Sequence, residues 1–132
     1  MAGMLVNQGE TIMLEALVNK TAPQSLVLKL FTNDKTPAEG DAAGAYTEAS
    51  GNGYASVALT PASWTTAAGA PSQVEYPQVT FTFTGALGSV YGYFIVQTTS
   101  GLLVAAERFS DGPYVIVNNG DQIKITPRVT QD

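Results

Sequence analysis

The sequence contains no cysteine and no histidine among its 132 residues. Without cysteine, the chain has no disulfide, no thiolate nucleophile and no zinc–thiolate site. Without histidine, it lacks the commonest general base and the commonest transition-metal ligand. Together these two absences exclude most kinds of catalytic site. We therefore expect a protein that is not an enzyme and that carries no cofactor.

Charged residues are also scarce, at 13% of the chain, and the net charge is −5. The six cations stand singly: Lys20, Lys29, Lys35, Arg108, Lys124 and Arg128. Nucleic-acid binding requires several cations on one face, so it is disfavoured, as is a basic membrane-surface helix. No apolar run approaches the roughly 20 residues of a bilayer span. The N-terminus lacks the features of a signal peptide, so we expect folding in a cytoplasm, with neither nucleic acid nor membrane as a partner.

Apolar residues make up 45% of the sequence, which is enough to build one hydrophobic core without a metal or disulfide. No repeat, linker or low-complexity tract divides the chain. We expect one domain covering residues 10–132, preceded by an N-terminal arm of residues 1–9.

A short helix is predicted over Glu10–Asn19. Four apolar residues recur there at helical spacing: Ile12, Met13, Ala16 and Leu17. Gly9 or Asn7 would cap its start, and Asn19 would end it. A strand is the competing interpretation, because further leucine and valine side chains make the segment apolar nearly all round.

From Ser25 onward the sequence is typical of short strands separated by turns about every ten residues. Val79–Thr84 alternates strictly between apolar residues and threonine. Val90–Gln97 is apolar on both faces and predicts a central strand, in which Gly92 marks a bulge or the close approach of a neighbouring backbone. About eight short strands after one short helix predict an all-β fold: a single β-sandwich of jelly-roll or immunoglobulin-like topology, or less favourably a small barrel.

Two turns predict hairpins. Ser50–Gly53 would join a strand at residues 45–49 to one at residues 54–59. Asn118–Asp121 contains Asn-Gly, which tolerates positive φ, and would join a strand at residues 114–117 to one at residues 122–126. A further short edge strand is expected at residues 64–66.

No constellation of residues predicts a catalytic or metal site. Most of the eleven carboxylates lie in turns, where they bond local backbone. The Asn33–Asp41 loop gathers four oxygen-bearing side chains, and calcium is the metal that such ligands suit. Because the loop lacks the spacing of an EF-hand, we interpret it as a polar surface loop.

The candidate sites are therefore contact surfaces. The N-terminal segment is apolar and would lie on its own sheet or on a neighbouring copy. Trp64 anchors a partner or plugs one end of the fold, and tyrosines are common both in interfaces and in sandwich cores. The candidate partner-contact residues are Met4, Leu5, Val6, Trp64 and Tyr76.

Six stretches resemble small virion proteins of tailed bacteriophages: LVNQGETIMLEALVN, LVLKLFTNDKTP, YTEASGNGYASVALTPASW, VTFTFTGALGSVYGYFIV, AERFSDGP and VNNGDQIKITPRV. The resemblance covers nearly the whole chain and contains no catalytic signature. It implies a virion subunit, assembled in a bacterial cytoplasm, that decorates or cements the capsid as trimers bound to the major capsid protein. A tail or fibre component is the alternative within the same class. A carbohydrate-binding module, with Trp64 and tyrosines as a stacking platform, is the alternative from another class.

Overall fold

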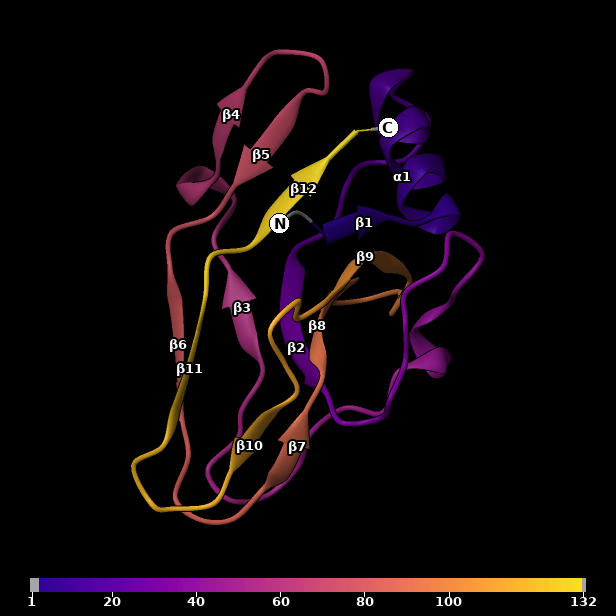
Figure 1. The fold of residues 1–132 in the computed structure, drawn as a ribbon. Helices are drawn as coiled ribbons and strands as arrows, with labels where there is room; N and C mark the ends of the chain where they lie inside the picture. Colours follow the sequence, from indigo (N-terminus) through magenta and orange to yellow (C-terminus); the bar gives the residue numbers. More distant parts are fainter. Residues whose placement is uncertain (1–2, 132) are drawn as a thin grey trace.

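The computed structural model describes residues 3–131, which form twelve strands, one α-helix and two short 3-10 helices (Figure 1). The helices are α1 (Asn7–Leu17), η1 (Ala43–Ala45) and η2 (Pro61–Ser63). The first six strands are β1 (Gly3–Leu5), β2 (Leu26–Phe31), β3 (Val57–Leu59), β4 (Thr65–Ala67), β5 (Gln73–Glu75) and β6 (Val79–Thr82). The last six are β7 (Gly88–Val90), β8 (Gly92–Gln97), β9 (Leu103–Arg108), β10 (Tyr114–Ile116), β11 (Gln122–Ile125) and β12 (Arg128–Thr130). The expected β-rich fold with one N-terminal helix is confirmed.

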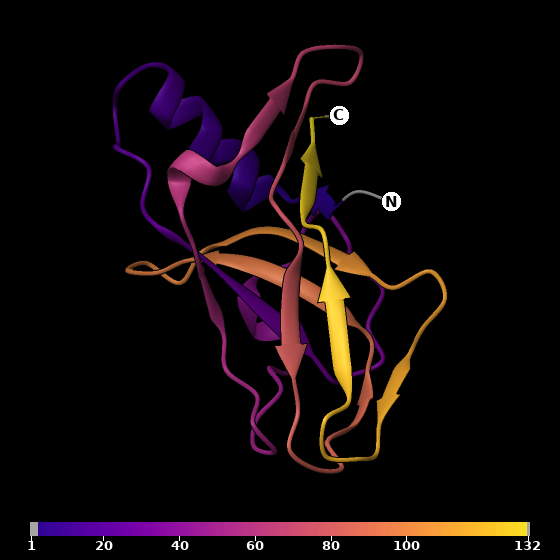
Figure 2. The ribbon, with the colours of Figure 1, turned by 90° about the vertical axis from the view of Figure 1, so that its left-hand side faces the viewer.

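Eight of the strands form one sheet that curls into a half-barrel, in the order β3-β2-β8-β9-β1-β12-β5-β4. The other four form two separate antiparallel ribbons, β6–β11 and β7–β10. Figure 2 shows β6 and β11 side by side, running across the strands of the large sheet. The expected sandwich is not confirmed, because one curled sheet and two ribbons replace two complete facing sheets.

The main core lies between the central strands β2 and β8 and the two ribbons. Alternate side chains of β2, β6, β8 and β11 point into it, as a period of two requires. Its buried members include Leu28, Leu30, Val79, Phe81, Phe83, Val90, Tyr93, Ile95, Ile116, Ile123 and Ile125. The alternation predicted for β6 is therefore confirmed.

A second, smaller core explains why β8 is buried along its whole length. On the other face of the sheet, the rings of Phe94 and Tyr46 stack with their centroids 5.3 Å apart. Phe31 meets Tyr46 edge-on, with a centroid distance of 5.0 Å. The polar loop after β2 brings Tyr46 there, so it covers this face. A strand buried on both faces reads as a continuous apolar run, as β8 does.

Gly92, at the start of β8, lies where two backbones approach closely. A Cβ atom there would stand 2.1 Å from the carbonyl oxygen of Glu107 and 2.6 Å from the ring of Phe31. The prediction of a close approach is confirmed, and the alternative of a bulge is wrong at this residue: the irregularity in β8 lies between Ile95 and Val96.

The N-terminal residues from Gly3 onward form no separate arm. Strand β1 lies inside the large sheet, antiparallel to β9 and parallel to β12. Residues 7–9 already belong to α1, which begins three residues earlier than predicted and has no side-chain cap. The expected division at residue 9 is therefore not seen in residues 3–131; residues 1 and 2 lie outside the described part.

Both predicted hairpins are wrong in their pairing, although their turns are present. Gly51, Asn52 and Gly53 have positive φ, but β3 pairs with β2, and residues 45–49 contribute only an isolated bridge to Phe31. Asn118–Asp121 turns with Gly120 at φ +93°, yet β10 pairs with β7 and β11 pairs with β6. The chain thus crosses between ribbons at this turn. The edge strand expected at residues 64–66 is β4, which does end the large sheet.

Candidate functional site

Helix α1 is held against β9 by very close packing at its first turn. The N–H of Val6 donates to the carbonyl of Val104 at 3.1 Å, and a Cβ on Gly9 would stand 2.2 Å from the same oxygen. Only glycine permits this approach. The helix is therefore fixed at its start, while its last turns run away from β9 (Figure 1).

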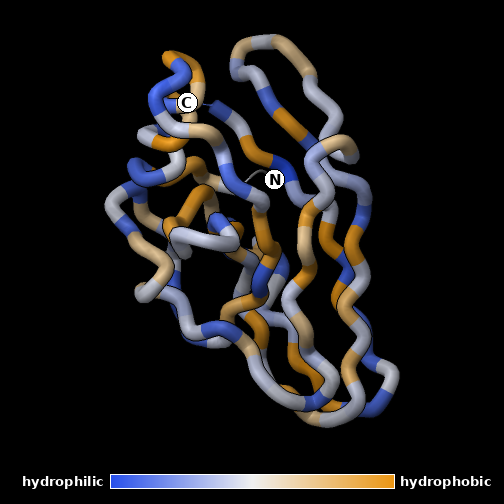
Figure 3. Tube along the Cα trace, turned by 180° about the vertical axis from the view of Figure 1, so that it is seen from behind, coloured by the Kyte–Doolittle hydropathy of each residue, from blue (hydrophilic) through white to orange (hydrophobic). Residues whose placement is uncertain are grey.

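The outward side of α1 and the residue after it form an exposed apolar face. Of the predicted helix face, Ile12 and Ala16 are half-buried, but Met13 and Leu17 are exposed. The exposed fractions are Met13 38%, Leu14 57%, Leu17 78% and Val18 70%. Figure 3 shows the hydrophobic colouring at the free end of the helix. We call these four residues the α1 face. The sequence signal for this face was the predicted helical segment that is apolar nearly all round.

The N-terminal contact residues lie mostly inside the protein. Leu5 and Val6 are buried in the chain's own core, so they offer no surface to a partner in this fold. Met4, which precedes Leu5 and points to the other face of β1, is 36% exposed. Of the two positions open to an apolar N-terminal segment, its own sheet is the one it occupies.

Trp64 and Tyr76 form a pair at one end of the main core. Their rings meet edge-on with centroids 5.1 Å apart, and both side chains are half-buried against the core. The Tyr76 hydroxyl accepts a hydrogen bond from the N–H of Thr60 at 2.8 Å, which lowers the pKa of Tyr76. This arrangement favours the plug over the partner anchor, although part of each ring reaches the surface.

Three side chains of the Asn33–Asp41 loop have their oxygen atoms engaged by the chain itself: Asn33, Asp34 and Asp41. Asp41 pairs with Lys35 at 3.0 Å and accepts hydrogen bonds from the Tyr46 hydroxyl and the Ala38 N–H. Desolvation acts to raise the pKa of Asp41, but these partners outweigh it and hold the pKa below its usual value. Asp34 pairs with Arg108 at 2.6 Å. Among residues 3–131 no group of three acidic, His or Cys side chains is placed to hold a metal ion.

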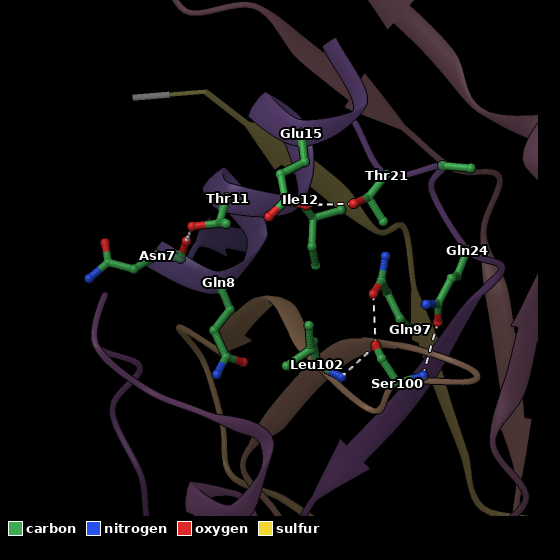
Figure 4. Close-up of a pocket in the computed structure, with 11 residues that line it drawn as sticks. Asn7, Gln8, Thr11, Ile12, Glu15, Thr21, Gln24, Gln97, Ser100 and Leu102 are labelled. Carbon is green, nitrogen blue, oxygen red and sulfur yellow. Dashed lines mark hydrogen bonds between the residues drawn. The ribbon is translucent and has the colours of Figure 1, made fainter. Parts of the chain in front are cut away.

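A pocket of about 310 Å³ lies between α1 and the turn that joins β8 to β9 (Figure 4). Ile12, Glu15 and Gln8 of α1 form one wall, and Gln24, Gln97 and Leu102 are among the residues opposite. Sequence reasoning missed this pocket, because its lining joins α1 and the loop after it to the distant β8–β9 turn and includes no His, Cys or aromatic side chain.

Glu107 is a half-buried ionisable residue with one oxygen atom that the fold leaves unpaired. Its Oε2 atom is buried and has no hydrogen-bond partner within the described residues. Burial raises the pKa of Glu107, against the smaller opposing effects of the Tyr93 hydroxyl and of Arg128. Burial likewise raises the pKa of Tyr93, and the nearby Glu107 charge adds to that shift.

We expect Glu107→Gln to raise the melting temperature at neutral pH but not in acid. A carboxyl whose pKa is raised in the folded state costs no stability at low pH, where it is protonated in both the folded and the unfolded protein. As pH rises above the ordinary pKa of about 4.3, the unfolded protein ionises first and the folded state loses stability. The neutral amide has no such loss. The check is a series of thermal melts from about pH 3.5 to pH 7.5. Glu39→Gln, at an exposed loop position, is the control, and equal gains at both ends of the series would contradict the prediction.

The structure contains no membrane-length apolar helix within residues 3–131. A comparison with known proteins finds no matching family model, no matching curated protein and no matching solved structure.

Proposed function

We propose that this chain is a non-enzymatic structural subunit of a tailed-phage virion, which binds the outside of the capsid as a decoration or cement protein. The observation that carries the proposal is the α1 face, together with the sequence resemblance described above. An apolar face on the only α-helix of residues 3–131 is costly in water unless another surface covers it. The partners proposed are further copies of the chain, as a trimer, and the major capsid protein.

The energetics suit docking by many copies. Covering Leu14, Leu17 and Val18 would contribute about 3–6 kcal/mol before the cost of association is subtracted. Such a contact is modest for a single molecule. Repetition around a lattice, or association into a trimer, converts modest contacts into stable occupancy. The net charge of −5 keeps the free subunit soluble until it docks.

Two alternatives are distinguished by different measurements. A tail or fibre subunit would use the same apolar face at another place on the particle, so the position of labelled copies in electron micrographs decides between them. For a carbohydrate-binding module, the Trp64 ring would need an open face, and its edge-on contact with Tyr76 limits that. A glycan array with no binding would discard the carbohydrate alternative, and glycan binding unchanged by Trp64→Ala would discard Trp64 as its stacking platform.

The double variant Leu14→Gln/Leu17→Gln tests the α1 face. Glutamine is a good helix former and both positions are exposed, so we expect an unchanged melting temperature. Capsid occupancy should fall at least about tenfold, which corresponds to about 1.4 kcal/mol of lost contact. The measurement is co-sedimentation of purified protein with empty capsids.

The matched control is Val115→Thr/Val117→Thr, which removes two other exposed apolar side chains at and just after β10. We expect this variant to bind capsids normally. Full occupancy by the Leu14/Leu17 variant would sink the assignment of docking to α1.

A further inference from the structure

We infer that the pocket between α1 and the β8–β9 turn binds a short, uncharged peptide segment of a partner protein. This inference rests on the proposed function, because it names the kind of group that a docking partner presents beside α1. Its volume of about 310 Å³ is at the lower end of the range for ligand sites, about 300–1,000 Å³.

Two carboxamide groups in the pocket have bonded oxygens, and their nitrogens have no hydrogen-bond partner among residues 3–131. Gln24 Oε1 accepts the N–H of Ser100 at 2.9 Å, and Gln97 Oε1 accepts the Ser100 hydroxyl at 2.7 Å. With the oxygens fixed in this way, each amide nitrogen is turned to the other side. In Figure 4 the nitrogen of Gln97 points away from Ser100, into the space below α1.

Gln97 contributes a donor that the fold holds in the pocket wall. The residue is only 4% exposed, and it is the one buried polar residue among residues 3–131. No hydrogen bond from its amide nitrogen to another described residue is present, although the oxygen is bonded. This nitrogen is not a fully buried atom without a partner, so it is open to the pocket, where an acceptor from outside the chain would replace water.

The rest of the lining restricts what that acceptor belongs to. Glu15 Oε2 accepts the Thr21 hydroxyl at 2.6 Å, and its carboxylate places a negative charge in the same pocket. A negatively charged ligand is therefore disfavoured. Ile12 and Leu102 supply apolar surface, and Leu102 is 41% exposed. The occupant needs neutral acceptors, a donor for Glu15 and an apolar side chain.

A peptide meets all three requirements. Its carbonyls would accept from Gln24 and Gln97, an N–H would donate to Glu15, and one aliphatic side chain would rest on Ile12 and Leu102. A sugar offers hydroxyl groups of both kinds, but the pocket has no aromatic ring on which a sugar face could stack. The observations thus favour the peptide.

The pocket also adjoins the α1 face. Thr11, at the rim, is three residues before Leu14 and seven before Val18, so the three share one stripe along the helix. A partner segment that enters the pocket can continue directly onto exposed apolar surface. The pocket would then supply the polar contacts and the α1 face the apolar contacts of one continuous interface.

The test is a titration of the full chain, labelled with ¹⁵N, with acetylated and amidated tetrapeptides that carry one leucine and no charge. We expect the side-chain amide signals of Gln24 and Gln97 to shift. Gln97→Glu and Gln24→Glu keep the held oxygen but replace the donor by a charged acceptor, so each should weaken peptide binding at least tenfold. Gln78→Glu, at an exposed loop position, makes the same change in charge and should leave binding unaltered.

The outcomes separate this inference from the proposed function. Shifts caused by neutral sugars but not by peptides, or no shift with any tetrapeptide, would overturn the peptide site. So would equal weakening by Gln78→Glu. Should Gln97→Glu fail to fold, Gln24→Glu alone decides, because its side chain lies at the pocket edge. Capsid docking that persists without peptide binding would remove only this inference, whereas peptide binding without docking would remove only the capsid assignment.

Discussion

Replacing Gly92 by alanine is expected to destabilise the protein by about 3 kcal/mol or more, at the upper end of the cost of overpacking. The added methyl group would meet the carbonyl oxygen of Glu107 at 2.1 Å and the ring of Phe31 at 2.6 Å. Gly92 pairs with both β2 and β9, so neither neighbour can withdraw without opening the centre of the sheet. The backbone at Gly92 does not have positive φ, so the whole cost is steric.

Urea unfolding of the variant measures this effect. Gly44→Ala is the matched control, because a Cβ there would meet nothing within 4 Å and the residue lacks positive φ. We expect the control to stay within about 0.5 kcal/mol of the unmodified chain. A stable Gly92→Ala protein would mean that β8 and β9 are farther apart than described.

Deleting residues 1–6 is expected to prevent folding. The deletion removes β1 from the middle of the large sheet and leaves β9 and β12 without a shared neighbour. It also removes the buried side chains of Leu5 and Val6, worth about 3–6 kcal/mol together. That loss is comparable with the whole stability of a small domain, about 5–15 kcal/mol.

Circular dichroism and gel filtration of the deleted chain test this expectation. Met4→Gln, in the same strand but on its exposed side, should fold and melt normally. A folded, monomeric deletion variant would show that β1 contributes little. The same experiment bears on capsid binding, because lost docking after this deletion would report unfolding and not a lost contact.

Patterns of short range were enough to predict most individual elements of the fold. The alternation in Val79–Thr82, the double-sided apolar run in Gly92–Gln97 and the helical spacing before Asn19 each depend on neighbours in the chain. The choice of a partner strand in the sheet does not depend on such neighbours. The Asn-Gly turn before Asp121 has hairpin chemistry, yet the strand on each side pairs with a strand at least 20 residues away. Local turn preference was outweighed by the packing of Ile116 and Ile123 into a common core.

The surface features were harder to predict for a related reason. An apolar residue such as Leu5 or Leu17 has the same affinity for a core, and the sequence does not say which of them the fold leaves outside. Here β1 pairs with a strand on each side, whereas α1 packs mainly against β9, so the strand is covered and part of the helix stays exposed. The pocket depends on Gln24 and Gln97, which both bond Ser100 although they are 73 positions apart in the sequence, a separation at which no motif is visible.

The position of β1 also constrains how the chain folds as it is synthesised. Gly3 aligns with Val129 and Met4 aligns with Ala106, so these two residues of β1 have partners more than one hundred positions downstream. The sheet cannot close until residues 128–130 have left the ribosome. Contacts between residues so far apart in the sequence form slowly, because a long loop must close, at a cost in entropy, before the strand pairing stabilises it. Until then the apolar segment Met4–Val6 lacks the partners that bury it in the folded sheet.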